Sequence, residues 1–529
     1  MRAPAKTATP GSPVPLKAVV DEGQPEPEPG FRKVSLWLLA AALLPRALLM
    51  PLNENLYGDA VVRTELGLRW AAHPHWISSF ADAYQFGPLH LYLIGIASWL
   101  YPDPVVVGRA VSLVFGTLSV LPLYALTRRL FGWRAGVAAC LGFAVWGMHL
   151  QMSTTAGSEA LCLCLVLWML ALFAKGLDEG RFAPIAYAAL VLNLACATRY
   201  DCWAFVPLLA VLLFLQDPDK VAATTRAVFF GFFALPFPLI WMEGNARAYG
   251  DSFKPIHYIE QFHQAWVADG VARWTEWGYR GINLFFWPGT ALLTLSPLLA
   301  LLGGLGMVAA WRRYPQHRWL VWTVLAPTAF FTFKAAVMLN FVPLARFAVN
   351  QVGLLLPFVY LGYLAVAKGR PSWVGRTLGS ATALTAVALP LALGLFTFHH
   401  DGPRPDTYRP VSPTSTNPVA LMQVAHFLDE KVRPQGGAAI LDQEDTHYWD
   451  LQIAFFSRIP ELKLARYRWD TFDKRVRENH PKTLVRVEGG KLEHDPRFTL
   501  LAAGIRFQDH LFRELPGFQA PWHVYQRAD

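Results

Sequence analysis

The sequence predicts a polytopic α-helical membrane protein that carries a small soluble α/β domain at its C-terminal end. Hydrophobic residues make up 54% of the 529 residues and charged residues only 16%, against roughly 25% charged residues in soluble domains. The apolar residues gather in long blocks up to about residue 398, and the stretch that follows has an ordinary soluble composition. Because backbone polar groups in lipid must be satisfied within the segment itself, we expect these blocks to be helices.

The net charge does not point to a nucleic acid. The chain has 47 Lys and Arg against 38 Asp and Glu, a formal charge of +9, but in a membrane protein the placement of the charges matters more than their sum. The five cysteines lie in or beside apolar segments, so we expect no disulfide framework in the soluble part. Residues 1–33, rich in Pro and polar residues, read as a disordered cytoplasmic tail without a cleavable signal peptide.

Residues 34–398 form the predicted membrane domain, with eleven segments apolar enough to cross a bilayer, which takes about 20 residues. They lie near 34–52, 107–127, 135–152, 159–175, 183–200, 202–216, 226–243, 289–311, 319–338, 347–367 and 376–398. The apolar segment Gly87–Tyr101 is short and follows a polar loop. We therefore expect it to be an interfacial or re-entrant helix.

The distribution of basic residues sets the expected orientation, because Lys and Arg accumulate in short cytoplasmic loops. With eleven spans and the N-terminus inside, every short interior loop is basic, namely the loops that hold Arg128, Arg129 and Arg134; Lys175 and Arg181; Lys220 and Arg226; Arg312, Arg313 and Arg318; and Lys368, Arg370 and Arg376. The external parts are then residues 53–106, a short turn near 153–158, residues 244–288, the turn at 339–346 and everything after residue 398. We expect a bacterial inner (plasma) membrane protein whose C-terminal domain is periplasmic or extracellular.

The C-terminal part mixes strand and helix patterns. Ala438–Leu441, Thr483–Val487 and His523–Gln526 read as strands and Val419–Lys431 as a helix. A Pro-rich linker, 399–418, precedes this predicted domain, 419–529. No internal repeat is evident, which argues against a transporter built from inverted repeats.

Five cations lie at the external ends of predicted spans, although most Lys and Arg residues beside the spans lie on the cytoplasmic side. They are Arg46, Arg109, Arg199, Lys334 and Arg346. Each could reach the lipid headgroups or pair with an acid. Together they suggest an anionic ligand such as the phosphate of a membrane lipid, which Arg and Lys bind through charge-assisted hydrogen bonds.

Two acids share that face. Asp59 follows the first span, and Glu159 opens the fourth after Ser158. Each has an ordinary alternative, Asp59 as an exposed loop acid and Glu159 as a carboxylate that favours a helix N-terminus. Surrounded by cations, the two instead resemble an acid–base and phosphate site, in which an ionised carboxylate takes a proton from a hydroxyl.

The N-terminal half resembles a known family. Gly58-Asp59 after the first span, then Phe86-Gly87-Pro88-Leu89-His90-Leu91-Tyr92, then the stretch VGRAVSLVFGTLSVLPLYALTRRLFGWRAGVAACLGFAVWGMHLQMSTTAGSEAL resemble the GT-C-type glycosyltransferases. Within them the chain is most similar to the branch of the protein O-mannosyltransferases and the lipid A aminoarabinose transferase. Residues 34–215 carry the resemblance, whereas later residues match in span pattern and in Ala345-Arg346-Phe347.

The resemblance implies a GT-C-like fold and an enzyme that moves a sugar from a polyprenyl-phosphate donor to an acceptor protein, lipid or glycan outside the membrane, with inversion. Asp59 would be the general base, Glu159 a second acid, and Arg109 and Arg346 would lie near the donor phosphate. The chain departs from the family in Ala60, where many relatives have Glu, in Gly87, where a double Pro is usual, and in Arg63, where an aromatic residue is usual.

Further residues are weaker candidates. Arg63, His90 and Tyr92 could contact the acceptor or the sugar. His73 and His75 have a spacing that two metal ligands can adopt, but His-x-His in a loop is more often incidental. We expect no required cofactor and leave a divalent metal open.

Two other classes of function compete with this hypothesis. A secondary transporter of an anionic solute would place polar groups near the bilayer midplane, whereas the charges here lie at the external edge. A non-catalytic scaffold would bind envelope proteins through its C-terminal domain. A lipid-linked oligosaccharide polymerase or ligase is a nearer alternative and would differ only in donor and acceptor.

Overall fold

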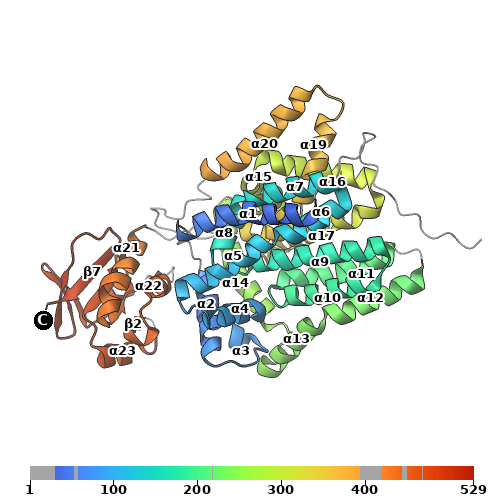
Figure 1. Cartoon of the computed structure of the whole chain (residues 1–529). Helices are drawn as coiled ribbons and strands as arrows, with labels where there is room; N and C mark the ends of the chain where they lie inside the picture. The colour runs from blue at the N-terminus through green and yellow to red at the C-terminus, as the bar shows by residue number, and fades with distance from the viewer. Residues whose placement is uncertain are drawn as a thin grey trace, which may run out of the picture.

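The computed structural model describes residues 30–52, 58–216, 219–392, 419–443, 449–467 and 469–528. It consists of a helical body and, at one end of it, a smaller domain built around a β-sheet (Figure 1). The expected fold class, a polytopic helical protein with a C-terminal α/β domain, is confirmed. Most of the predicted tail and the whole linker 399–418 lie outside the described residues.

The first half of the body alternates long apolar helices with a group of shorter ones. Its elements are α1 (Phe31–Leu49), η1 (Met50–Leu52), α2 (Gly58–Ala72), α3 (Phe80–Ala83), α4 (Pro88–Ser98), α5 (Pro104–Leu118), α6 (Val120–Phe131), α7 (Trp133–Ala144), α8 (Gly147–Thr154), α9 (Glu159–Glu179), α10 (Phe182–Cys196), η2 (Tyr200–Ala204) and α11 (Phe205–Gln216). The predicted interfacial segment is the eleven-residue helix α4. It packs against α2, in the loop that was predicted to be external.

The second half contains two long helices, α14 and α15, in the predicted second loop. Its elements are α12 (Lys220–Ala234), α13 (Pro236–Tyr249), α14 (Lys254–Trp274), α15 (Glu276–Thr294), α16 (Pro297–Arg313), η3 (Pro315–His317), α17 (Arg318–Thr332), η4 (Phe333–Val337), η5 (Ala345–Ala348), α18 (Val349–Gly353), η6 (Leu356–Phe358), α19 (Val359–Ala367) and α20 (Ser372–Ala392).

The predicted count of eleven spans is not confirmed. Four helical stretches in the described part of the chain are long and apolar enough to cross a membrane, or seven if each of three bent pairs counts as one span. The bends follow local chemistry: α15 and α16 meet at 119° where Ser296 has a positive φ and Pro297 opens the next helix. The span predicted near 289–311 contains this bend and is therefore not one continuous helix.

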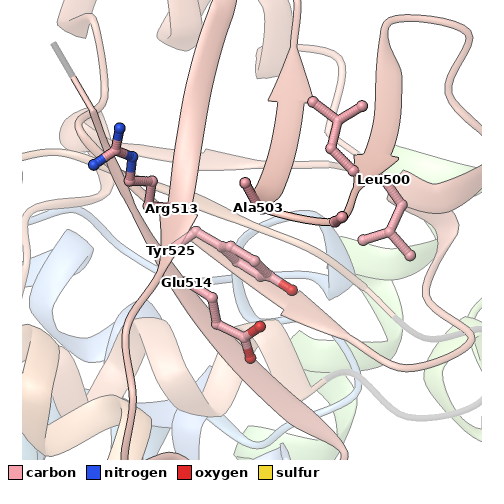
Figure 2. Close-up of a pocket in the computed structure, with 8 residues that line it drawn as sticks. Leu500, Ala503, Arg513, Glu514 and Tyr525 are labelled. Atoms are coloured by element: carbon pink, nitrogen blue, oxygen red, sulfur yellow. The ribbon is translucent and has the colours of Figure 1, made fainter.

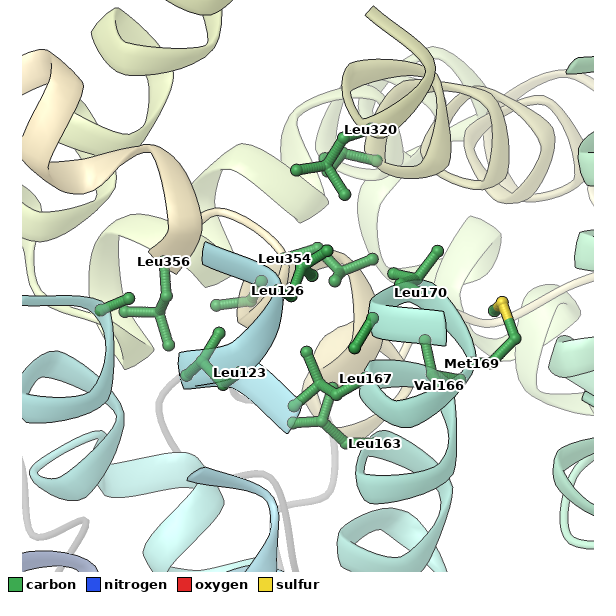
Figure 3. Packing of buried hydrophobic residues seen from close by; sticks show 14 of the residues in the cluster. Leu123, Leu126, Leu163, Val166, Leu167, Met169, Leu170, Leu320, Leu354 and Leu356 are labelled. Carbon is green, nitrogen blue, oxygen red and sulfur yellow. The ribbon is translucent and has the colours of Figure 1, made fainter. Parts of the chain in front are cut away.

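The core of the helical body is a continuous apolar cluster. Leu123 and Leu126 of α6 face Leu163 and Leu167 of α9, and Leu354 lies between these helices and α17 (Figure 3). Most of α9 is buried, as expected of a helix whose sequence is largely apolar. Because α9 is anchored through most of its length, its first residue is held in a fixed place.

Helices α16 and α19 approach each other through glycine. A Cβ on Gly306 would overlap the carbonyl group of Phe358, and one on Gly362 would overlap that of Leu302. By contrast, Gly304 on α16 has no atom within 4 Å of such a Cβ. The contact therefore needs glycine at two positions, as in other closely packed membrane helices.

The C-terminal domain has one seven-stranded mixed sheet in the order β2-β1-β3-β7-β6-β5-β4. Its elements are α21 (Val419–Phe427), η7 (Leu428–Val432), η8 (Arg433–Gln435), β1 (Ala439–Leu441), α22 (Trp449–Ser457), η9 (Glu461–Lys463), β2 (Leu464–Arg466), α23 (Phe472–Asn479), β3 (Thr483–Val487), η10 (Lys491–His494), β4 (Phe498–Leu501), β5 (Gly504–Phe507), β6 (His510–Glu514) and β7 (Trp522–Arg527). β1 pairs in parallel with β2 and β3, and the remaining pairs are antiparallel. The three predicted strands and the predicted helix are confirmed as β1, β3, β7 and α21 with η7.

The glycine contact gives a matched pair of substitutions. Gly306→Ala should destabilise the protein by roughly 1–3 kcal/mol, because the added methyl group forces two helices apart. Gly304→Ala on the same helix should be neutral or stabilising by up to about 1 kcal/mol, since only chain entropy changes. Unfolding midpoints in one detergent compare the two variants, and equal midpoints would contradict the packing described.

Candidate active site

Asp59 and Arg346 meet although 287 residues separate them in the sequence. Asp59 lies in the first turn of α2, and Arg346 lies in η5. Nη2 of Arg346 donates to Oδ2 of Asp59 at 2.8 Å, and the exposed fractions of the two side chains are 13% and 30%. The carboxylate of Asp59 is thus fixed by a cation and still reachable from outside.

Glu159 forms the second half of the same network. It is the first residue of α9 and is fully buried. Nη1 of Arg199 donates to its Oε1 at 2.8 Å, and Nη1 of Arg346 lies 3.9 Å from the same oxygen. A helix N-terminus adds a favourable field for this charge. Arg346 therefore lies between both predicted acids, and the structure unites Asp59, Glu159, Arg199 and Arg346 in one site.

The sequence reasoning missed three members of this network. Nε of Arg199 donates to Oδ1 of Asp201 at 3.0 Å, and Nδ2 of Asn350 donates to Oδ2 of Asp201 at 3.3 Å. The guanidinium carbons of Arg199 and Arg346 lie 5.5 and 5.2 Å from the ring centre of Phe347, within cation–π range. The available signal was an acid directly after an apolar helix, in Arg199-Tyr200-Asp201.

Lys334 lies beside the network and is bound to α14. Its Nζ contacts Oε1 of Glu260 at 2.6 Å. On the same helix, Nδ1 of His263 accepts from the backbone N–H of Val342 at 3.3 Å. Burial, with the nearby Arg346 and Lys334, lowers the pKa of His263 to about 4. The imidazole is therefore neutral near pH 7, and α14 places it over the cationic end of the site.

Arg109 and Arg46 act between helices. Nε of Arg109 donates to the carbonyl oxygen of Thr154, and its Nη2 donates to that of Met50, which joins α5 to α8 and η1. Arg46 is fully buried; its Nε donates to Oγ of Ser153 at 3.2 Å, and its Nη2 lies 2.9 Å from Nδ1 of His149. Arg46 thus holds α1 against α8 and presents no exposed surface to a ligand.

The three weaker contact candidates have different surroundings. Arg63 is buried with its guanidinium 3.9 Å from the ring centre of Phe86. Tyr92 accepts from the backbone N–H of Ile77 at 2.8 Å, a contact that organises the loop. His90 is fully buried, and within the described residues neither ring nitrogen has a hydrogen-bond partner.

The residues considered for metal binding do not form one site with the acids. Nδ1 of His75 lies 2.8 Å from the carbonyl oxygen of His73, and its Nε2 lies 3.8 Å from Asp82. Among the described residues, the ligand atoms close enough to share an ion belong to Cys162, Asp201 and Cys202. The two Sγ atoms are 3.2 Å apart and both are buried. Two sulfurs on a tetrahedral zinc would stand about 3.7 Å apart, from Zn–S bonds of about 2.3 Å, so the present spacing is that of packed thiols.

A shallow pocket lies on the C-terminal sheet, apart from this network. Leu500 and Ala503 border it at the turn between β4 and β5, and Arg513, Glu514 and Tyr525 border it on β6 and β7 (Figure 2). Its lining residues all belong to the C-terminal domain.

Comparison with known proteins shows which fold the chain has. The helical body and sheet domain have the fold of the GT-C glycosyltransferases, and the resemblance seen in the sequence is confirmed. More particularly, residues 85–241 match the family model described as dolichyl-phosphate-mannose-protein mannosyltransferase. This segment contains Glu159, Arg199 and Asp201. No curated protein matches the chain significantly.

Two similar solved structures show the extent of the likeness. ArnT from Cupriavidus metallidurans bound to undecaprenyl phosphate is 14% identical, with a TM-score of 0.55 over 94% of this chain and 97% of that one. The oligosaccharyltransferase AglB from Archaeoglobus fulgidus, in complex with an inhibitory peptide and a dolichol-phosphate, is 14% identical, with a TM-score of 0.50 over 88% of this chain and 70% of that one.

The role of the guanidinium group of Arg199 can be tested, because two of its nitrogen atoms bind Asp201 and Glu159 in a geometry that the single nitrogen atom of Lys does not reproduce. Arg199→Lys keeps the charge but gives up the contact to Glu159 or to Asp201, so we expect a loss of about 1–3 kcal/mol in stability. Arg181→Lys is the matched control, since Arg181 is 67% exposed and contacts Glu179 at 3.5 Å. Thermal unfolding in detergent should separate the variants, and an unchanged midpoint for Arg199→Lys would show that its fork is not needed.

Proposed function

We propose that the chain is an integral-membrane glycosyltransferase that moves a hexosyl or pentosyl group from a polyprenyl-phosphate donor to an acceptor on the external face of the membrane. The observation that carries the proposal is the bridge of Arg346 between Asp59 and Glu159. One acid is partly exposed and the other fully buried, so the two are suited to different tasks. The membrane fold and the GT-C resemblance support the class of reaction.

Asp59 is the proposed general base. It takes the proton of an acceptor hydroxyl, the hydroxyl oxygen forms a bond to the anomeric carbon, and the bond from that carbon to the phosphate oxygen breaks. Attack from the side opposite the phosphate inverts the configuration. Polyprenyl phosphate leaves with the bonding electron pair.

Arg346 is the proposed phosphate ligand and also controls the base. In the structure its Nη2 occupies Oδ2 of Asp59. A donor phosphate competes for the same guanidinium, and Arg strongly favours such charge-assisted bonds. Binding of the donor therefore frees Asp59 for the acceptor, so that the donor binds first.

Glu159 and Arg199 support this exchange. Because Glu159 is buried, it cannot reach an acceptor at the surface, but it keeps Arg346 and Arg199 close together. Lys334, which like Arg346 lies close enough to His263 to lower its pKa, adds positive potential where the leaving phosphate gains charge. Arg109 secures the segment before Glu159 through Thr154.

The base assignment predicts a specific loss of activity. Asp59→Asn should lower sugar transfer to a hydroxyl acceptor by about 10²- to 10⁴-fold, because the amide cannot take the proton. The assay follows a radiolabelled polyprenyl-phosphate sugar into a membrane extract. Asp82→Asn, in the same loop, serves as control and should transfer normally.

Two outcomes are informative beyond the loss itself. Normal transfer by Asp59→Asn with a hydroxyl acceptor would overturn the base assignment. Retained transfer to a phosphate acceptor alone would identify an acceptor that is already ionised and needs no base.

A further inference from the structure

The C-terminal domain packs directly behind the proposed base. Ala60 and Val61, the two residues after Asp59, are fully buried in an apolar cluster that consists mainly of C-terminal residues. From the helical body this cluster also includes Val105 and Ala156. From the C-terminal domain it includes Leu421, Val424, Leu428, Ile453, Phe456 and Trp522. α22 lies beside α2 in the fold (Figure 1).

The two ends of α2 are held by different parts of the protein. Towards its end, Gly67 and Trp70 pack on α4, where a Cβ on Gly67 would lie 2.8 Å from Ile94. The first turn, which carries Asp59, buries Ala60 and Val61 in the apolar cluster that the helical body shares with the C-terminal domain. Loss of the contact between α2 and the C-terminal domain would thus make the first turn of α2, which carries Asp59, less well fixed.

A partly buried ion pair joins the C-terminal domain to the helical body. Nε of Arg458 contacts both carboxylate oxygens of Asp103 at 3.2 and 3.0 Å, and its Nη1 contacts Asp429 at 2.7 Å. Asp103 also caps α5 by accepting from the N–H groups of Val105 and Val106. Arg458 has a φ of 52°, a conformation that costs a residue other than glycine about 1 kcal/mol or more. The ion pair compensates for this cost.

We propose that the C-terminal domain is a positioning clamp, which holds the first turn of α2 so that Asp59 stays against Arg346 and within reach of the acceptor. Arg458 and Asp103 are its positioning residues. This proposal rests on the proposed function only because it takes Asp59 as the base. The packing of the C-terminal domain against α2 does not depend on any reaction.

The test is a double-mutant cycle on the full chain in detergent. Arg458→Gln removes the cation, and Asp103→Ser removes the anion but keeps a residue that caps helices well. Each should raise hydrogen exchange in the first turn of α2 and lower kcat by about 10- to 100-fold, with little change in the KM for the donor, because a small misplacement of a reacting group is costly. The double variant should be no worse than either single one.

The control is Arg433→Gln. Arg433 also binds Asp429, at 2.5 Å, but it lies within the C-terminal domain, so exchange in α2 and kcat should stay normal. Unchanged α2 exchange in both single variants would overturn the clamp, whatever their activity. Raised α2 exchange together with normal transfer by Asp59→Asn would instead refute the base assignment and with it the clamp's catalytic role.

A second arm of the test uses pH. Glu65 of α2 faces Arg69 on its own helix, Arg466 and Asp450 on β2 and α22, and Glu461 on η9. Burial between the domains raises the pKa of Glu65 from 4.5 to about 7. The protonated form is therefore the one that favours docking: its contribution is complete below the ordinary pKa and is lost as pH rises through about 7.

We expect α2 exchange, corrected for its intrinsic pH dependence, to increase between about pH 4.5 and about pH 7 and to change little above that range. Glu65→Gln mimics the protonated carboxyl group and should stay docked across that range. Glu478→Gln, on the exposed face of α23, is the matched control and should behave as the unmodified protein does. The same pH response in Glu65→Gln would contradict the role of Glu65 in docking.

Discussion

The buried charge of Glu159 is the constraint on which the site depends. A carboxylate without water costs several kcal/mol unless cations and hydrogen bonds replace its solvent. Arg199 at 2.8 Å and Arg346 at 3.9 Å supply that compensation, together with the N-terminus of α9. Since 14 of the 21 residues of α9 are buried, this helix fixes the position of Glu159 and, through it, that of the two cations.

This arrangement gives Arg346 two possible anionic partners. One is Asp59, which it binds in the structure, and the other is the phosphate of the proposed donor. A cation shared in this way would couple donor binding to the availability of Asp59, the proposed base. Lys334 of η4 is paired with Glu260 of α14, and the neutral His263 lies on the same helix α14.

The sequence predicted much of this site because charge is rare in apolar segments. Asp59, Glu159, Arg199 and Arg346 each stand out at the end of a predicted span, and their side chains converge. The sequence alone does not show which way a helix faces. Arg46 therefore could not be told apart from the other cations at the ends of predicted spans, although in the structure it is fully buried against His149 and Ser153. Asp201 was missed although its partner Arg199 lies only two residues away, whereas His263 was missed because its partner Val342 lies far away along the chain.

The fold class followed from the composition, but the number of membrane spans and the positions of their bends did not. The break at Ser296 and Pro297 falls inside a run that is apolar throughout, where hydropathy has no signal. In the C-terminal domain β1, β3 and β7 were predicted, whereas β2, β4, β5 and β6 were not. β2 has only three residues, and the burial of β4 does not alternate along the strand. The contact between α2 and α22 depends on tertiary packing alone.

The most direct test of the account is the affinity for a sugar-free polyprenyl phosphate, measured on the purified protein with Asp59→Asn and with Arg346→Gln. If Asp59 and the phosphate compete for Arg346, then Asp59→Asn should bind polyprenyl phosphate more tightly than the unmodified protein, and Arg346→Gln should bind it more weakly. Equal affinities for all three proteins would show that Arg346 does not receive the phosphate and would contradict the account.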